Sequence, residues 1–270
     1  PLQVLSREDG RQSGRCDLVQ PRVLMYDDTD GIKRQQGGIE RGGFQQPVLG
    51  GRLHSRRLFD ERHIRLAGND DPNTTAMTVA RYNYAFAVDT INHIYFGDLT
   101  FRHYGQGSDA KAIYLTDASD NLVQGCTFAS NDVGVGIKYN SHRNVIQDNV
   151  FYDTIFDWPW DGVKEGAGGT MEDGGVYIYE PSAGRGNVIR RNTFHDDFDA
   201  MHVCPETDVV SNETDIYENL IYNMGDDGME TDGLCSNVRI WGNTFHDTLM
   251  GVSLAPALTG PVYAIRNLIY

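Results

Sequence analysis

Acidic side chains concentrate in one stretch of the sequence, between residues 172 and 232. They form three groups: Glu172 and Asp173; Asp196, Asp197 and Asp199; and Asp226, Asp227, Glu230 and Asp232. Crowded carboxylates repel one another, which costs stability and raises the pKa of some of them. Acidic residues with a purely structural role need not be crowded in this way and so need not lose stability. The stretch therefore predicts catalysis, with calcium binding and a solvated acidic face as alternatives.

Carboxylates in pairs are the groups that cleave glycosidic bonds. One acid protonates the leaving oxygen, and a second carboxylate acts as base or nucleophile. The candidate catalytic residues are Asp173, Asp199, Asp227, Glu230 and His202. His202 is expected to tune an acid or to bind substrate. Asp226 and Asp232 are the candidate ligands if the site holds calcium.

Flat aromatic rings lie next to these acids in the sequence. Trp158 and Trp160 belong to an insertion at residues 152–172. Rings beside carboxylates hold sugars through apolar stacking, although both tryptophans would also fit a role in fixing the insertion. Trp158, Trp160, Tyr177 and Lys138 are the candidate substrate-binding residues.

A repeat of about two dozen residues must position all these groups. Seven segments each end on an aromatic residue: 94–101, 121–128, 144–151, 187–194, 215–222, 238–245 and 263–270. The terminal rings are expected to form one interior column that includes Phe128, Phe151, Phe194, Tyr222 and Phe245. Asparagines recur two residues before the aromatic residue, at 149, 192 and 243, and at the start of the repeat, at 121, 144, 187 and 237, and predict side-chain amide ladders.

A second block in each repeat reads small, apolar, variable, apolar. Its copies are 112–115, 136–139, 175–178, 200–203, 228–231 and 251–254. This alternation indicates a short strand with one buried face, and no helical stretch separates the strands. The variable position then points outward, through Tyr114, Lys138, Tyr177, His202, Glu230 and Ser253. Asp199 and Asp227 share another register on neighbouring coils, whereas Asp173 is two coils from Asp227 and offset by one residue.

These segments, with the pattern N-x-I-x-x-N-x-F followed by a glycine-containing strand, resemble the repeats of the pectin-lyase-like superfamily. The resemblance covers about residues 85–270. It implies an all-β fold, a right-handed parallel β-helix of about seven or eight coils. It also implies a carbohydrate-active protein, because that superfamily includes glycoside hydrolases, polysaccharide lyases, sugar epimerases, esterases and phage tailspikes. We expect residues 67–270 to form the β-helix and residues 1–66 to form an atypical segment, a cap or irregular.

Charge narrows the range of partners. Residues 1–66 hold 12 basic and 9 acidic residues, a net charge of +3, whereas residues 67–270 hold 11 and 29, a net charge of −18. The acidic part argues against nucleic acid, and no apolar run is long enough to span a membrane. The expected partner is a polysaccharide or oligosaccharide. The last repeat has no polar cap at Tyr270, so a partner chain or further coils are expected to cover it.

Three function classes remain open from the sequence. The first is a glycoside hydrolase, which requires no cofactor. The second is a calcium-dependent polysaccharide lyase, for which Lys138 and Lys164 are the nearby lysines. The third is a non-enzymatic adhesin or fibre segment. The chain has four cysteines, of which Cys204 and Cys235 fall in neighbouring repeats and form either a disulfide or two buried thiols. The expected location is extracellular or periplasmic, with a secretory signal absent or already removed.

Overall fold

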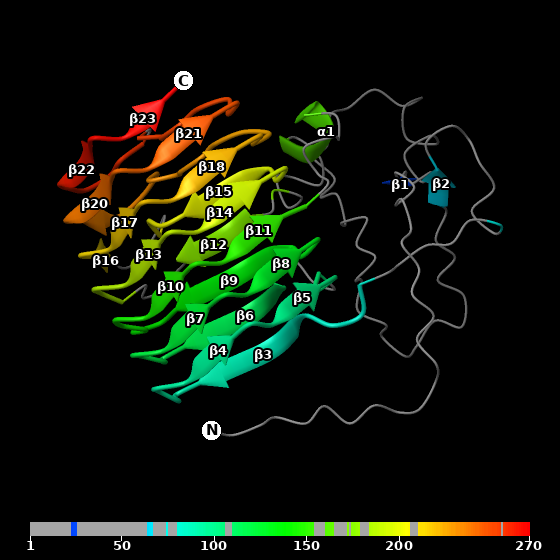
Figure 1. The fold of residues 1–270 in the computed structure, drawn as a ribbon, viewed down its shortest axis with the longest axis horizontal. Helices are drawn as coiled ribbons and strands as arrows, with labels where there is room; N and C mark the ends of the chain where they lie inside the picture. The colour runs from blue at the N-terminus through cyan, green and yellow to red at the C-terminus, as the bar shows by residue number, and fades with distance from the viewer. Residues whose placement is uncertain are drawn as a thin grey trace, which may run out of the picture. The chain divides into compact units, whose positions relative to one another are not determined.

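The described residues of the computed structural model form a stacked coil of short parallel strands (Figure 1). Those residues are 23–25 and 64–66 (backbone only), 74, 80–105, 110–153, 160–164, 172, 174–178, 184–205, 210–254 and 256–270. Most of the predicted segment 1–66 lies outside them. Within it, β1 (Val23–Met25) pairs antiparallel with β2 (Ile64–Leu66). Among the described residues, β3 is the first strand of the parallel β-helix.

Two sheets of seven parallel strands run along the helix. The first sheet contains β4 (Tyr95–Gly97), β7 (Leu122–Gln124), β10 (Val145–Gln147), β13 (Val188–Arg190), β17 (Asp215–Tyr217), β20 (Val238–Trp241) and β22 (Val262–Ile265). The second sheet contains β5 (Thr100–Arg102), β8 (Thr127–Ala129), β11 (Val150–Tyr152), β14 (Thr193–His195), β18 (Leu220–Tyr222), β21 (Thr244–His246) and β23 (Leu268–Ile269). Seven stacked strands correspond to about six turns, slightly fewer than the predicted seven or eight coils.

The third sheet has five strands and carries the predicted acids. It contains β3 (Tyr84–Asp89), β6 (Lys111–Thr116), β9 (Val133–Lys138), β12 (Gly174–Ile178) and β15 (Asp199–His202). Isolated bridges continue it from His202 to Glu230 and from Glu230 to Ser253. A short pair, β16 (Ser211–Asn212) and β19 (Cys235–Ser236), is also parallel.

The insertion contributes α1 (Trp160–Lys164), the one α-helix of the described residues. Val163 is its buried residue, so α1 packs through that side chain. None of the described helices is long and apolar enough to cross a membrane.

Stacked phenylalanines form the interior column that the repeat predicts. The rings of Phe101, Phe128, Phe151 and Phe194 lie in sequence with centroids 4.9, 4.5 and 4.7 Å apart. Small residues face this column because a larger side chain there would collide with the rings. A Cβ on Gly134, for example, would lie 2.7 Å from the ring of Phe151, closer than carbon atoms approach.

Tyr222 is not part of the interior column, contrary to the prediction. The register pairs Phe194 with Ile221, and Ile221 with Phe245. Alternation then turns Tyr222 outward, where its ring stacks between His195 and His246 at 5.2 and 5.1 Å. The prediction was wrong because the interior residue of this segment, Ile221, is apolar without being aromatic, whereas the neighbouring Tyr222 carries the aromatic ring.

Asparagine ladders stabilise the turns as predicted, with one exception. Side-chain amides bond from Asn121 to Asn144 and Asn187, and from Asn149 through Asn192, Asn219 and Asn243 to Asn267. Asn237 does not belong to the first ladder. The register places Thr214 and then Val238 after Asn187.

Candidate functional site

The third sheet brings Asp199 and Asp227 onto adjacent coils in one register, as the repeat predicts. The backbone N–H of Asp227 donates to Oδ1 of Asp199 at 2.8 Å. Three residues further along each coil, His202 bridges to Glu230. Residues far apart in the sequence therefore form one cluster, because successive coils place them at the same register of the stack.

Asp199 is the buried member of the cluster, with 0% of its surface exposed. Its Oδ2 has no hydrogen-bond partner among the described residues. Burial raises the pKa of Asp199 well above its usual range, and the charge of Glu230 raises it further. A carboxyl group with no exposed surface cannot touch a sugar, so Asp199 can act only through its neighbours.

Asp227 and Glu230 are less deeply buried than Asp199. Asp227 is 7% exposed, and the side chain of Glu230 is 14% exposed. Burial raises the pKa of Asp227 to about 7, helped by the charges of Asp226 and Glu230. Burial also raises the pKa of Glu230 to about 7, although the cation of Lys164 opposes that rise. Near neutral pH the pair can therefore hold one proton.

Lys164 is the cation of the site. From the sequence it was predicted only as a possible base of a lyase. It reaches from α1 to Asp226 Oδ2 at 2.7 Å and to Glu172 Oε2 at 3.3 Å. Burial alone would lower the pKa of Lys164, but the bond to Asp226 and the charge of Glu172 raise it overall. The signal available in the sequence was a single lysine in the insertion, close to many acids.

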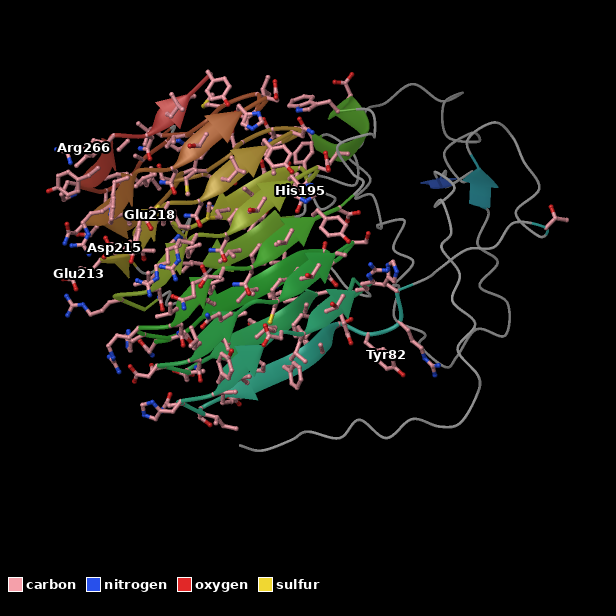
Figure 2. The ribbon with its side chains drawn as sticks, in the orientation of Figure 1. Tyr82, His195, Glu213, Asp215, Glu218 and Arg266 are labelled. Atoms are coloured by element: carbon pink, nitrogen blue, oxygen red, sulfur yellow. A yellow bond between two sulfur atoms is a disulfide. The ribbon has the colours of Figure 1, made fainter. Side chains whose placement is uncertain are left out.

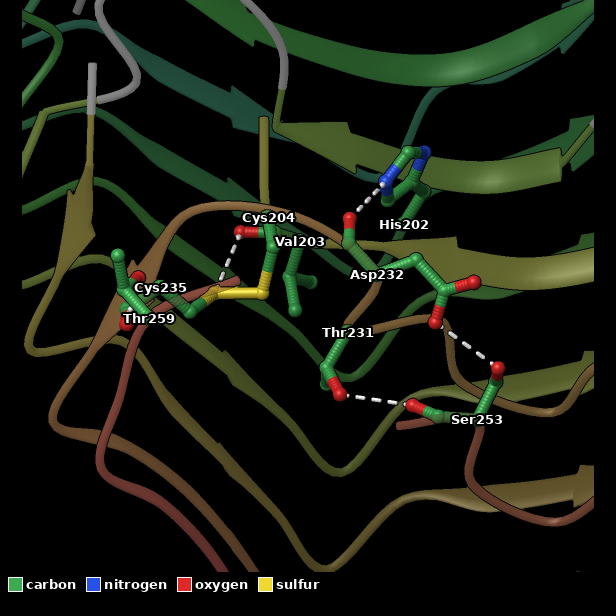
Figure 3. The surroundings of a disulfide bond; sticks show 8 residues. All are labelled: His202, Val203, Cys204, Thr231, Asp232, Cys235, Ser253 and Thr259. Atoms are coloured by element: carbon green, nitrogen blue, oxygen red, sulfur yellow. Dashed lines mark hydrogen bonds between the residues drawn. A yellow bond between two sulfur atoms is a disulfide. The ribbon is translucent and has the colours of Figure 1, made fainter. Parts of the chain in front are cut away.

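His202 contacts Asp232 (Figure 3) and also lies near Glu230. Its Nε2 is 3.2 Å from the backbone oxygen of Asp232, and its Nδ1 is 3.6 Å from Glu230 Oε2. A carbonyl oxygen can only accept, so Nε2 carries the hydrogen and donates. In neutral His202, Nδ1 is then a bare acceptor that faces Glu230.

The disulfide Cys204–Cys235 lies beside this histidine and settles the two options left by the sequence (Figure 3). It joins the residue two after His202 to the residue three after Asp232, so it fixes the two coils of the cluster to each other. The hydroxyl of Ser253 donates to Asp232 Oδ1 at 2.9 Å.

The predicted substrate-binding residues are only partly brought to the cluster. Trp160 is 40% exposed, and its ring lies 6.5 Å from that of Phe198, the neighbour of Asp199. Tyr177 is only 6% exposed, and it meets His202 edge-on at 5.9 Å. Trp158 and the catalytic candidate Asp173 lie outside the described residues.

Lys138 does not share the register of Tyr177, contrary to the prediction. Gly136 pairs with Tyr177 and with Tyr114, whereas Lys138 pairs with Thr116. The sequence offered two glycines in this strand, and the interior small residue is Gly134 rather than Gly136. The predicted alignment of this coil was therefore wrong by two residues.

The candidate calcium ligands are engaged with other groups. Asp226 pairs with Lys164, and Asp232 accepts from Ser253. Within the part of the chain that the structure describes, no group of three or more His, Cys, Asp or Glu side chains is arranged to hold a metal ion. Calcium ligation by Asp226 and Asp232 stays a prediction.

Comparison with known proteins identifies the family. The family model for the right-handed beta helix region matches residues 64–204, which is more than half of the chain. The chain therefore belongs to this family, which is consistent with the resemblance to pectin-lyase-like repeats. Searches among curated proteins and among solved structures find no match.

Proposed function

We propose that this protein is a glycoside hydrolase that cleaves a neutral or weakly charged polysaccharide, with Asp227 and Glu230 as its catalytic carboxylates. The observation that carries the proposal is that Asp227 and Glu230, three residues apart on the coil that continues the third sheet, each have a pKa raised to about 7. A glycosidase needs one protonated and one ionised carboxyl group at its working pH. Two acids whose pKa values lie near neutral pH supply both forms.

The surroundings of the two acids favour a division of roles. After burial, the largest influence on the pKa of Glu230 is the cation of Lys164, which favours the ionised form. After burial, the largest influences on the pKa of Asp227 are the anions Asp226 and Glu230, which favour the protonated form. Asp227 is therefore assigned as the acid that protonates the leaving oxygen. Glu230 is assigned as the ionised carboxylate, the second group that the reaction requires.

The remaining residues are assigned supporting roles. His202 lies against Glu230, with Nδ1 3.6 Å from Oε2, and is itself fixed by the carbonyl of Asp232. Trp160, which is 40% exposed, is assigned as a surface for a sugar ring, with Trp158 as a second candidate. Tyr177, which is buried edge-on against His202, is assigned to position the histidine ring. Asp173 is kept as a further candidate acid, and Lys138 as a contact further along the sheet.

The state of Lys164 favours hydrolysis over a lyase reaction. A lyase needs a neutral base to abstract a proton, and Lys164 is held protonated by Asp226 and Glu172. A polysaccharide substrate and a disulfide both fit an extracellular or periplasmic location, where disulfides persist.

A panel of polysaccharides, assayed with and without chelator, tests the proposal. New reducing ends without the ultraviolet absorbance of an unsaturated uronate are expected, and chelator should not abolish them. Chelator-sensitive absorbance would instead indicate a calcium-dependent lyase. Activity on no member of the panel would favour the non-enzymatic reading.

A further inference from the structure

A row of five side chains crosses the outward face of the first sheet, on consecutive coils. Gln124, Gln147, Arg190, Tyr217 and Trp241 occupy one register, and we call them the Gln–Arg–Trp row. Coils are about 4.8 Å apart, so the row is about 19 Å long. The alternation of β7, β10, β13, β17 and β20 turns all five side chains away from the core.

Hydrogen bonds fix four members of this row to one another. Gln147 Nε2 donates to Gln124 Oε1 at 3.1 Å, and Arg190 Nε donates to Gln147 Oε1 at 2.8 Å. Arg190 Nη1 donates to the hydroxyl of Tyr217 at 2.6 Å. The rotamers are thus set in advance, which lowers the entropy lost when a ligand is bound.

Arg190 differs from the other arginines of this region in its partners. Arg143, Arg185, Arg191 and Arg239 each pair with a carboxylate. Among the described side chains, none of the ion pairs within 4 Å includes Arg190. The carboxylate of Asp148 is bound by Arg191, at 2.8 and 2.9 Å; that bond lowers the pKa of Asp148, and the charge of Arg190 lowers it further. Arg190 therefore keeps its charge between two neutral partners. A guanidinium fixed in this way, with further N–H donors, suits a planar oxyanion.

An aromatic pair completes the row. The rings of Tyr217 and Trp241 stack at 4.2 Å, and Trp241 is 37% exposed. An outward tryptophan at this exposure offers apolar surface to a sugar ring. Arg190 and Trp241 are two coils apart, about 10 Å, which leaves room for adjoining sugar units.

We propose that the Gln–Arg–Trp row binds a linear oligosaccharide that carries a carboxylated sugar. Arg190 receives the carboxylate, Gln124 binds a hydroxyl, and Trp241 packs on a neighbouring ring, while Gln147, which is only 8% exposed, holds Arg190 in place. The row belongs to the first sheet and the acid cluster to the third, so this site does not depend on the proposed hydrolase activity. Figure 2 shows Asp215 of the first sheet and His195 of the second sheet on opposite sides of the stack.

Binding of hexagalacturonate, measured by calorimetry on the full chain at low and at moderate salt, tests this site. Saturable binding that weakens with salt is expected, because salt screens the ionic contact to Arg190. Arg190→Gln and Trp241→Ala should each weaken binding about tenfold. Arg143→Gln, which removes an exposed arginine paired with Asp120, should leave it unchanged.

Three results would overturn the proposal. They are no saturable binding by the wild-type protein, equal binding by the Arg190→Gln variant, and equally tight binding of uncharged cellohexaose. Melting temperatures of the variants ensure that a loss of binding is not a loss of fold. Asp227→Asn should bind hexagalacturonate normally even if it abolishes hydrolysis, which separates this site from the catalytic proposal.

Discussion

Replacing the two catalytic candidates separates chemistry from fold. Asp227→Asn and Glu230→Gln keep the side-chain shape but cannot exchange a proton near neutral pH. We expect each to lower turnover of a confirmed substrate by about 10²-fold or more. Melting temperatures should stay level or rise, because each change removes repulsion from a crowded cluster. Near-full activity in both variants would show that these acids are not the site.

The same acids make stability depend on pH. Their unfolded pKa values are about 4, and their folded values are about 7. Between these limits the folded state binds protons that the unfolded state has released. The free energy of unfolding should therefore fall as pH rises from about 4 to about 7, and the contribution should level off above that.

Urea unfolding of Asp227→Asn across this range measures the effect. The variant lacks the titrating group, so its advantage over the wild-type protein should grow with pH. Asp89→Asn, a change at an exposed acid of β3, should run parallel to the wild type. Parallel curves for Asp227→Asn as well would contradict the raised pKa.

At the scale of elements, α1 controls the charge of the site through Lys164. Lys164→Met removes the cation that favours ionised Glu230 and also acts on Asp227. The pKa of both acids should rise, and the pH profile of hydrolysis should move as a whole to higher pH. Lys164→Arg should restore the profile, and the remote change Arg143→Met should not move it. A profile that does not move in Lys164→Met would rule out this role for α1.

The asparagine ladder of the turns makes a separate prediction. The side chain of Asn192 takes part in four hydrogen bonds, with Ile146, Asn149 and Asn219, and it is buried. Asn192→Ala leaves several buried polar groups without partners, which should cost about 2–4 kcal/mol. Asn140→Ala, at an exposed residue with one long bond to Asp117, is the control and should change little. Equal losses in chemical denaturation would contradict the ladder's role.

The sequence was sufficient for the fold and for the register of Asp199, Asp227, His202 and Glu230. Alternation of apolar residues and the recurrent asparagines determine both, since a strand slip would expose the core. The prediction from the sequence was wrong where two neighbouring residues satisfied the same pattern, as with Tyr222 beside Ile221. The role of Lys164 was also hidden, because a contact between an inserted helix and a later coil depends on tertiary packing rather than on the repeat.

For the whole molecule, stability is expected to depend on contacts between neighbouring coils, as in other solenoids. The disulfide Cys204–Cys235 joins two such coils across 31 residues of chain. A cross-link over a loop of this length restricts the unfolded chain and is worth about 3–4 kcal/mol in the chain-entropy description. Both sulfurs belong to buried residues, and the link lies next to His202 and Asp232.

The double variant Cys204→Ala/Cys235→Ala should therefore be less stable by about 2–4 kcal/mol. The largest loss of amide protection should fall in residues 199–235, because those coils lose their direct link while more distant coils keep their own neighbours. Hydrogen exchange and urea unfolding, with and without reductant, measure this. Reductant should destabilise the wild-type protein toward the variant and leave the variant unchanged. A variant as stable as the wild type, or a uniform loss of protection along all coils, would contradict the prediction.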